Sequence, residues 1–280
     1  MIDMKTAFFG AGNMGGAIIS AAIASGAAQA ADIIVYDKNR DAAERFAREY
    51  GTLTAESAVT AAQSAEILFV AVKPGVVPEL IKEIRDAALE PGKIIVSIAA
   101  GVQVSTYTEL LNEDIRLVRT IPNMPAMVRE GITGVYFYHF TKEDMAARTY
   151  ILQLFNAFGR SVVVEKEIMI DEMVAVTSSS PAYVCLMIEA MADAAVLAGF
   201  ARKDAYLMAE QAVLGTAKLM LERDVHPAVL KDQICSPAGT TIEAVASLEA
   251  SGFRSSLIQA MEACRNKTRQ LGGKDSKCGK

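Results

Sequence analysis

The stretch from Cys235 to Gly252, CSPAGTTIEAVASLEASG, begins with small and hydroxyl residues and continues as a helical pattern. It contains no His, Lys or Arg, and its only acids are Glu243 and Glu249. Backbone N–H groups and hydroxyls that precede a helix can bind a carboxylate. Thr240 and Glu243 also have the spacing of a capping box, in which two side chains satisfy free backbone groups at a helix start. Taken alone, the stretch favours the cap.

A second stretch, FFGAGNMGGAI, carries three glycines with the spacing of a dinucleotide-binding turn. This GxGxxG pattern follows a strand-like run and opens a helical pattern, which is the context that such a turn requires. The first glycine makes the tight turn, the second lets the backbone approach a pyrophosphate, and the third allows the helix to pack on the strand. The helix start favours the phosphates. The residues predicted to bind the cofactor here are Gly10, Ala11, Gly12, Asn13, Met14 and Gly15.

The residues that follow the second predicted strand give conflicting signals about the cofactor. Asp37 lies 22 residues beyond Gly15 and could accept a hydrogen bond from a ribose 2′-hydroxyl, as in NAD binders. Lys38, Asn39 and Arg40 follow at once and suit a 2′-phosphate, as in NADP binders. We therefore expect a nicotinamide cofactor, with NADPH favoured over NADH and NAD left possible.

The elements that position these loops follow from short apolar runs that alternate with amphipathic stretches. Helical patterns cover Asn13 to Ser25, Asp41 to Tyr50 and Pro78 to Leu89. The alternation implies right-handed βαβ units and an α/β fold with a Rossmann-type doubly wound sheet. The runs predicted as buried parallel strands are TAFFG (6–10), IIVYD (33–37), EILFVAV (66–72), KIIVSIA (93–99) and IRLVRTI (115–121), with GVYFYHF and SVVVE as further strands around a helix.

Beyond about Ile168 the pattern changes to helices alone. Ser180 precedes Pro181 at a helix start, and further helical patterns run to Leu271. Their faces are rich in Ala, Leu and Met, so a homodimer or higher homo-oligomer that buries them is expected. We predict a dinucleotide-binding domain over residues 1–165, an all-helical substrate-binding and dimerisation domain over 166–272, and a mobile tail over 273–280.

Composition narrows the classes of partner. Hydrophobic residues make up 52 % of the 280 residues, which excludes a disordered chain, and the formal net charge of −5 argues against nucleic acid. The apolar runs are shorter than a membrane span, and the N-terminus has no signal-peptide pattern. The four cysteines lack metal-ligand spacing. We expect a cytoplasmic protein that binds a small molecule, with no metal, membrane or nucleic-acid partner.

Several stretches together resemble the pyrroline-5-carboxylate reductase family. The chain opens with GAGNMG and continues with AVKPG (71–75), VSIAAGV (96–102) and RTIPNMPAMVREGIT (119–133). SSSPAYVCLMIEAMADAAVLAG (178–199) and the SPAGTT stretch are similar to that family's helical domain, and SP-x-GTT is the most specific part. The resemblance implies reduction of 1-pyrroline-5-carboxylate to L-proline with NAD(P)H, the last step of proline biosynthesis.

The resemblance also implies roles for individual residues. Thr241 becomes the hydroxyl that contacts the ring nitrogen, and the substrate-binding set is Ser236, Gly239, Thr240 and Thr241. Asn123 lies in a rigid turn near the nicotinamide, although a turn Asn that bonds to the backbone is an equal reading. A cyclic imine can take its proton from solvent, so positioning carries much of the rate without a strong protein acid. Further residues that line or enclose the cofactor are Ala71, Val72, Lys73, Pro74, Ala99 and Ala100.

Two departures from the family pattern leave the substrate open. Ser178 and Ser180 replace glycines of the family's GSGPAY, and Ala238 replaces one glycine of its SPGGTT. The serines could restrict the loop if a positive φ is needed there. The alternatives to the leading function are a reductase of a related cyclic imine, such as a six-membered ring, and a dinucleotide-sensing protein without turnover.

Overall fold

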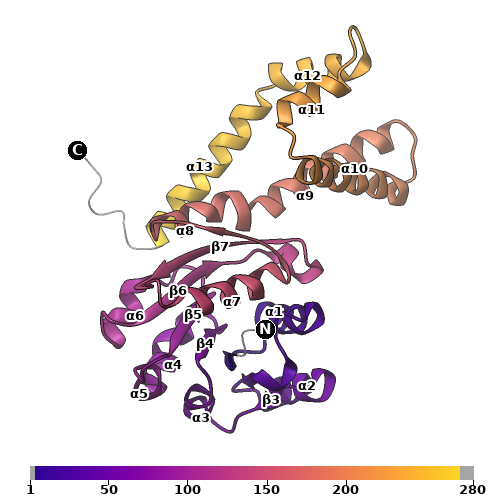
Figure 1. Cartoon of the computed structure of the whole chain (residues 1–280). Coiled ribbons are helices and arrows are strands. Elements are labelled where there is room, and N and C mark those ends of the chain that lie inside the picture. Colours follow the sequence, from indigo (N-terminus) through magenta and orange to yellow (C-terminus); the bar gives the residue numbers. More distant parts are fainter. Residues whose placement is uncertain (1–3, 272–280) are drawn as a thin grey trace, which may run out of the picture. The chain divides into compact units, whose positions relative to one another are not determined.

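In the computed structural model, which describes residues 4–271, the N-terminal part of the chain forms one eight-stranded sheet (Figure 1). The strand order is β3-β2-β1-β4-β5-β6-β7-β8. All neighbouring pairs are parallel except β6 and β7, which run antiparallel. The strands are β1 (Thr6–Phe9), β2 (Ile33–Tyr36), β3 (Leu53–Thr54), β4 (Ile67–Val70), β5 (Ile94–Ser97), β6 (Arg116–Ile121), β7 (Gly131–Tyr138) and β8 (Gly159–Val163).

Helices cover both faces of this sheet, which confirms the predicted doubly wound α/β fold. One core cluster joins the sheet to α1, α2 and α7, and the other joins it to α3, α4, α5 and α6. Phe8 of β1 belongs to the first cluster and its neighbour Phe9 to the second, because successive side chains of a strand point to opposite faces. The helices are α1 (Asn13–Ser25), α2 (Arg40–Tyr50), α3 (Ala58–Gln63), α4 (Val77–Glu83), α5 (Arg85–Ala88), α6 (Val104–Leu110) and α7 (Met145–Asn156).

The strand order reverses direction between β1 and β4, and this point fixes where a ligand can lie. The chain winds from β1 outward through β2 to β3, then returns to β4 on the other side of β1. At such a switch point the loops at the carboxyl ends of the two strands diverge and leave a crevice. The predicted cofactor residues follow β1, β2, β4 and β5, with Asn123 after β6, so the topology brings them to the carboxyl edge of these parallel strands.

The rest of the described chain is helical. The elements are α8 (Ile168–Met173), the π-helical segment η4 (Val174–Ser178), α9 (Ser180–Leu197), α10 (Arg202–Arg223), α11 (Pro227–Ile234), α12 (Thr240–Ala250) and α13 (Phe253–Leu271). By contacts the chain divides into a sheet unit, which holds residues 4–178 and 265–271 of the described part, and a helical unit, Ser179–Cys264.

These units differ from the division at residue 165 because α8 packs on β6 and β7 and so belongs with the sheet. The division into functional domains at residue 165 stays a prediction, and the tail over 273–280 lies outside the described residues.

The helical unit exposes an unusual amount of apolar surface. Leu186 and Leu207 are 67 % and 62 % exposed, and Leu197 is 91 % exposed. Within the described residues, one helical stretch, Ile168–Leu197, has the length and mean hydropathy (1.4) of a membrane span. A single such stretch is weak evidence of a span, and the absence of a membrane partner stays a prediction.

Candidate active site

The three loop glycines have the geometry of their predicted tasks. Gly10 has φ +107°, and a Cβ atom there would meet the Ala71 carbonyl oxygen at 2.7 Å. A Cβ at Gly15 would lie 2.5 Å from the Gly10 carbonyl oxygen, so α1 can approach β1 only with glycine at this position. A Cβ at Gly12 would meet nothing within 4 Å. The space beside Gly12 is therefore open on the side where a pyrophosphate would approach.

The start of α1 offers backbone donors at the same place. Gly12 is the N-cap, and no side chain caps the helix by a hydrogen bond. Asn13 is exposed at the first helical position, whereas Met14 packs partly against the core. Because the first N–H groups of a helix have no partner within it, they remain free for an anion.

Asp37 holds the loop rather than projecting as a free carboxylate. Its Oδ2 accepts a hydrogen bond from the Ala11 N–H at 2.8 Å, and its Oδ1 accepts one from the Asn39 N–H at 2.8 Å. The first bond fixes the Gly-rich loop against the end of β2, and the second closes the turn that follows Asp37. Spreading the carboxylate charge over two N–H donors also lowers its repulsion toward a phosphate.

Both predicted phosphate-binding cations are exposed, and each already has an acidic partner. Lys38 Nζ lies 2.9 Å from Glu79 Oε1 on α4, and Arg40 Nε lies 3.1 Å from Glu44 Oε1 on α2. The hydrogen bond to Glu79 raises the pKa of the Lys38 amine above its usual value. Exposed pairs of this kind contribute little and exchange readily, so either cation can turn to a ligand phosphate.

A cavity of about 280 Å³ gathers seven of the predicted cofactor residues. Those residues are Gly10, Gly12, Asp37, Lys38, Ala71, Val72 and Lys73. Sequence reasoning missed five others that line it: Phe9 and Tyr36, which end β1 and β2, and Val76, Leu80 and Glu83, which follow one face of η2 (Pro74–Val76) and α4. The carboxyl ends of adjacent parallel strands were the signal that could have found the first two.

The remaining predicted cofactor residues are not among those that line this cavity. Pro74 is exposed at the start of η2, and Ala100 is exposed in the loop after β5. Ala99 is buried, and its N–H donates to Ser97 Oγ at 3.2 Å. The loop after β5 is thus fixed to the strand from which it leaves.

Asn123 bonds to the backbone on both sides of its amide. Its Nδ2 donates to the Thr177 carbonyl at 3.0 Å, and its Oδ1 accepts from the Ile132 N–H at 2.9 Å. The side chain is 8 % exposed. It ties the turn after β6 to β7 and to η4, which is the backbone-bonding reading; a contact with the nicotinamide stays a prediction.

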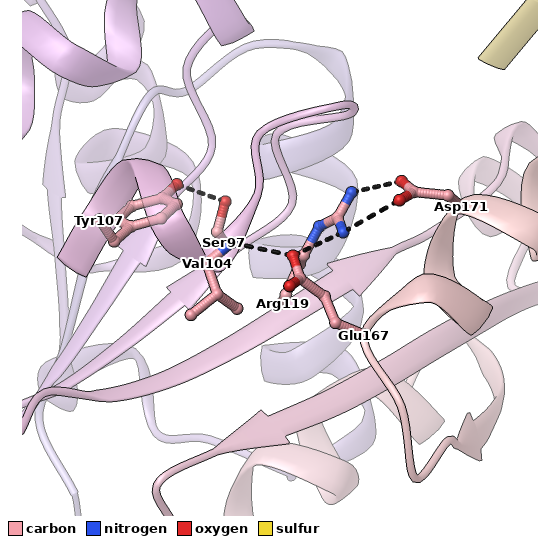
Figure 2. A network of polar contacts seen from close by, with 6 residues as sticks. All are labelled: Ser97, Val104, Tyr107, Arg119, Glu167 and Asp171. Carbon is pink, nitrogen blue, oxygen red and sulfur yellow. Dashed lines mark hydrogen bonds and ion pairs between the residues drawn. The ribbon is translucent and has the colours of Figure 1, made fainter. Parts of the chain in front are cut away.

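A buried polar network, which the sequence did not indicate, lies beside the loop after β5 (Figure 2). Arg119 of β6 is 2 % exposed and pairs with Glu167 at 2.8 Å and with Asp171 at 2.5 Å. The Tyr107 hydroxyl donates to Ser97 Oγ at 2.6 Å. Burial raises the pKa of Tyr107 to about 12, so the hydroxyl keeps its proton and remains a donor.

In the helical unit, the turn before α12 differs from the predicted capping box. Gly239 is the N-cap of α12, Thr240 is its first residue, and no side chain caps the helix by a hydrogen bond. The capping prediction for Thr240 and Glu243 is therefore wrong. Because the Gly239 N–H donates to the Ser236 carbonyl at 3.0 Å, the turn closes one residue earlier than expected. The N–H groups and hydroxyls of Thr240 and Thr241 are left available to a ligand.

The glycine replacements have different structural consequences. Ala238 has φ +55°, a left-handed conformation that costs a non-glycine residue about 1 to 2 kcal/mol. Ser179 has φ −93°, and neither Ser178 nor Ser180 has a positive φ. The serines therefore do not strain the start of α9, and the possible restriction of that loop does not arise.

Within residues 4–271 no group of three or more His, Cys, Asp or Glu side chains is arranged to hold a metal ion. A metal-free reaction stays a prediction. The available chemistry is that of N–H donors, hydroxyls and a phosphate-binding turn.

Two family models match the chain. Residues 167–271 match the model described as pyrroline-5-carboxylate reductase dimerisation, and residues 5–101 match that of NADP oxidoreductase, coenzyme F420-dependent. The first covers the region with the exposed apolar helices, and the second covers the Gly-rich loop and the strands up to β5.

Curated relatives align over nearly the whole chain. The pyrroline-5-carboxylate reductase of Escherichia coli K12 is 45 % identical, with 96 % of this chain and 99 % of that protein covered. The reductase of Methanosarcina acetivorans is 36 % identical over 98 % of this chain and all of its own.

Solved structures agree. The pyrroline-5-carboxylate reductase of Coxiella burnetii has a TM-score of 0.92 at 30 % identity, covering 96 % of this chain and 98 % of that one. The Plasmodium falciparum pyrroline carboxylate reductase, solved with NADP bound, has a TM-score of 0.81 at 26 % identity, covering 97 % and 99 %.

Proposed function

Because the chain belongs to the pyrroline-5-carboxylate reductase family, we propose that its sheet unit holds the dinucleotide and its helical unit binds the imino acid. The family resemblance found in the sequence is confirmed. The chain is an NAD(P)H-dependent oxidoreductase that reduces 1-pyrroline-5-carboxylate to L-proline, the last step of proline biosynthesis. The roles of individual residues are the proposal.

The residues at the carboxyl edge of the sheet fit a dinucleotide. Gly12 leaves open space where a side chain would block a phosphate, and the uncapped start of α1 supplies N–H donors. Ala71, Val72 and Lys73 also line the cavity. Bound there, NADPH supplies the hydride for the reaction. Lys38 and Arg40 favour its 2′-phosphate, and so NADPH over NADH.

The turn before α12 fits the substrate carboxylate and ring nitrogen. The free N–H groups at the start of an 11-residue helix favour an anion, and that of Thr240 is the first of them. The Gly239 N–H already donates to the Ser236 carbonyl, so a carboxylate would have to displace that turn contact to use it. Thr241 is partly exposed, and its hydroxyl can contact the ring nitrogen. Ser236 lies against Gly239 and contributes a second hydroxyl to the turn.

The chain needs no strong acid for this reduction. The imine nitrogen takes its proton from solvent, which leaves the adjacent ring carbon electrophilic. Hydride addition to that carbon then converts the C=N bond into a C–N single bond and leaves a neutral amine. The protein orients the ring and hydrogen bonds to its nitrogen, and this positioning supplies much of the rate enhancement.

The dimerisation model that matches residues 167–271 indicates a homo-oligomer. We propose that its contacts lie on the exposed apolar faces of the helical unit, which support a dimer or a larger assembly. A cytoplasmic location remains part of the proposal, as does the absence of a nucleic-acid partner, which the net charge of −5 supports.

The observation that carries the proposed site is the turn before α12. No side chain caps this helix, so backbone donors and the hydroxyls of Thr240 and Thr241 are available to a ligand. Steady-state oxidation of NADPH and NADH with 1-pyrroline-5-carboxylate and with its six-membered analogue tests the substrate. We expect a higher kcat/KM for the five-membered ring. A higher value for the six-membered ring would assign the chain to a related imine, and cofactor binding without turnover would make it a sensor.

A further inference from the structure

The buried network around Arg119 connects two segments that are far apart in the sequence. Arg119 Nη1 donates to Glu167 Oε1 at 2.8 Å, and Nη2 donates to Asp171 Oδ1 at 2.5 Å. Glu167 is the N-cap residue of α8 and Asp171 lies within that helix, which continues into η4. The guanidinium thus fixes the segment that leads to the helical unit against β6 (Figure 2).

The same network holds the far end of the loop after β5. Glu167 Oε1 also accepts a hydrogen bond from the N–H of Val104 at 2.9 Å. Val104 is the first residue of α6, whose start has no side-chain cap from the N-cap residue Gln103. Glu167 therefore takes the place of that cap, and Arg119 orients the carboxylate that does so.

The near end of the loop is held by a separate contact. Ser97 Oγ accepts hydrogen bonds from the Ala99 N–H at 3.2 Å and from the Tyr107 hydroxyl at 2.6 Å. Ser97 ends β5, and Tyr107 is on α6. The loop of residues 98–103 is consequently fixed at both ends, and each contact involves a residue of α6.

This loop lies on the nicotinamide side of the switch point. The Gly-rich loop follows β1 and Asp37 follows β2, so the adenosine half of a dinucleotide lies over β1 and β2. The second half crosses the switch point to the ends of β4 and β5, where the loop of residues 98–103 begins. The loop is therefore placed to contact the half of the cofactor that carries the hydride.

We propose that Arg119 and Glu167 are positioning residues that set the loop of residues 98–103 for the nicotinamide half of the cofactor. This inference rests on the proposed cofactor site. A buried ion pair is weak evidence for stability, because an apolar replacement often serves as well. Arg119 Nε is buried without a hydrogen-bond partner in the described chain, so the network is not optimised as a stabilising unit. Its contacts to the loop of residues 98–103, through Val104, and to α8, which continues into η4, indicate that it positions these segments.

Binding measurements on Glu167 variants separate placement from general destabilisation. Calorimetric titration with NADP⁺ and with adenosine 2′,5′-bisphosphate, which is the adenosine half alone, gives two dissociation constants per variant. Glu167→Ala removes the acceptor for Val104, and we expect its Kd for NADP⁺ to rise about tenfold, the loss of one charged hydrogen bond. Its Kd for adenosine 2′,5′-bisphosphate is expected to stay within about twofold.

Two further variants sharpen the comparison. Glu167→Gln keeps an oxygen acceptor for the Val104 N–H and should recover most of the NADP⁺ affinity. Glu165→Ala removes an exposed carboxylate two residues earlier in the chain and should change neither constant. If Glu167→Ala does not fold, Tyr107→Phe removes the contact at the other end of the loop, and its Kd for NADP⁺ should rise while its Kd for the fragment does not.

The failures are distinguishable. Wild-type protein that binds NADP⁺ no more tightly than the adenosine fragment contradicts the proposed cofactor site itself. If the wild type prefers NADP⁺ and Glu167→Ala, or Tyr107→Phe in its place, keeps that preference, only the positioning role is wrong. An equal loss of affinity for both ligands also contradicts the positioning role, because a general structural effect does not select one half of the cofactor.

Discussion

At the scale of single residues, the proposed substrate contacts are hydroxyl and N–H groups rather than a strong acid or base. Thr241 stands in the first turn of a helix whose start no side chain caps. Asp37 uses both oxygens on backbone N–H groups, which leaves Lys38, at the cavity, and Arg40 as the exposed charges that follow it. Under the proposed assignments, turnover and cofactor choice depend on individual donors, which substitution can remove one at a time.

Thr241→Ala should lower kcat by about 10- to 100-fold, or roughly 1.4 to 2.7 kcal/mol, if the hydroxyl bonds more strongly as the ring nitrogen changes charge. Thr241→Ser restores the donor and should recover much of the rate. The melting temperature should hardly move, because the Thr241 hydroxyl does not cap the helix. Single-turnover kinetics with both variants check this.

The matched control is Thr216→Ala, which removes an exposed threonine hydroxyl from α10. It should leave kcat unchanged. If Thr241→Ala leaves most of the protein unfolded but the remaining folded molecules keep full kcat, the role of Thr241 is purely structural.

Lys38→Gln should reduce kcat/KM for NADPH by about tenfold and leave that for NADH nearly unchanged, because only the former has a phosphate for the amine to contact. The preference for NADPH should also fall at high salt, since the side chain is exposed. Kinetics with both cofactors decide it, and a wild-type preference for NADH would mean that Asp37 governs the site.

At the scale of elements, the sequence predicts what local pattern controls. Helix α1 matches its predicted bounds, and five buried strands follow from apolar runs, because a parallel strand covered on both faces reads as continuous hydrophobic residues. The predicted helix of residues 78–89 divides at Ile84 into α4 and α5, and β3 has only two residues. Neither departure has a strong local signal.

The site was predictable to the same degree. The Gly-rich loop has a local pattern, so its glycine geometry follows from spacing. The pairing of Arg119 with Glu167 and Asp171 joins residues 48 and 52 positions apart, and no periodicity encodes it. The N-cap of α12 was predicted one residue late, because Thr240 satisfies the sequence rule while Gly239 has the extended backbone that the position requires.

Helix α13 is anchored by an ion cluster that should give stability a defined pH dependence. Glu172 of α8 pairs with Arg265 and with Arg269, the latter at 2.6 Å. Burial alone would raise the pKa of this carboxyl, but hydrogen bonds to Arg269 and Arg265 bring it below the usual value. The stabilisation is thus complete above the unfolded pKa of about 4.3 and is lost as pH falls through the lower folded pKa.

Glu172→Gln should therefore lower the free energy of unfolding at pH 7 by about 1 to 3 kcal/mol, and this difference should shrink toward zero below about pH 4. Urea denaturation at both pH values measures it. Glu249→Gln, in an exposed pair with Arg254, is the control and should change stability by less than about 0.5 kcal/mol. A difference for Glu172→Gln that persists in acid would contradict the ion-pair explanation.

At the scale of the whole molecule, the exposed apolar helices support the proposal that assembly accompanies folding. Leucines and other large apolar side chains on α9 and α10 are more than one third exposed, and such surface is stable in water only when another surface covers it. The dimerisation model covers the same region. If a second copy of the chain covers this surface, folding and oligomerisation form one coupled equilibrium.

The protein should accordingly be an oligomer at micromolar concentration by light scattering. Leu186→Asp on α9 should dissociate it, because a charge on a buried interface is costly. Leu53→Asp, which changes a 46 % exposed leucine on the sheet edge, should leave the assembly intact. Stable, active wild-type monomers would contradict the prediction.

The order in which the chain is made gives the Glu172 cluster a further consequence. The sheet unit is interrupted by residues 179–264 and resumes only at Arg265. Glu172 therefore leaves the ribosome 93 and 97 residues before its two arginines. At about 5 to 20 residues per second, it waits roughly 5 to 20 s for them. During each round of translation the Glu172 carboxylate of the nascent sheet unit lacks its two arginine partners until α13 has been made. Synthesis of α13 then completes the sheet unit.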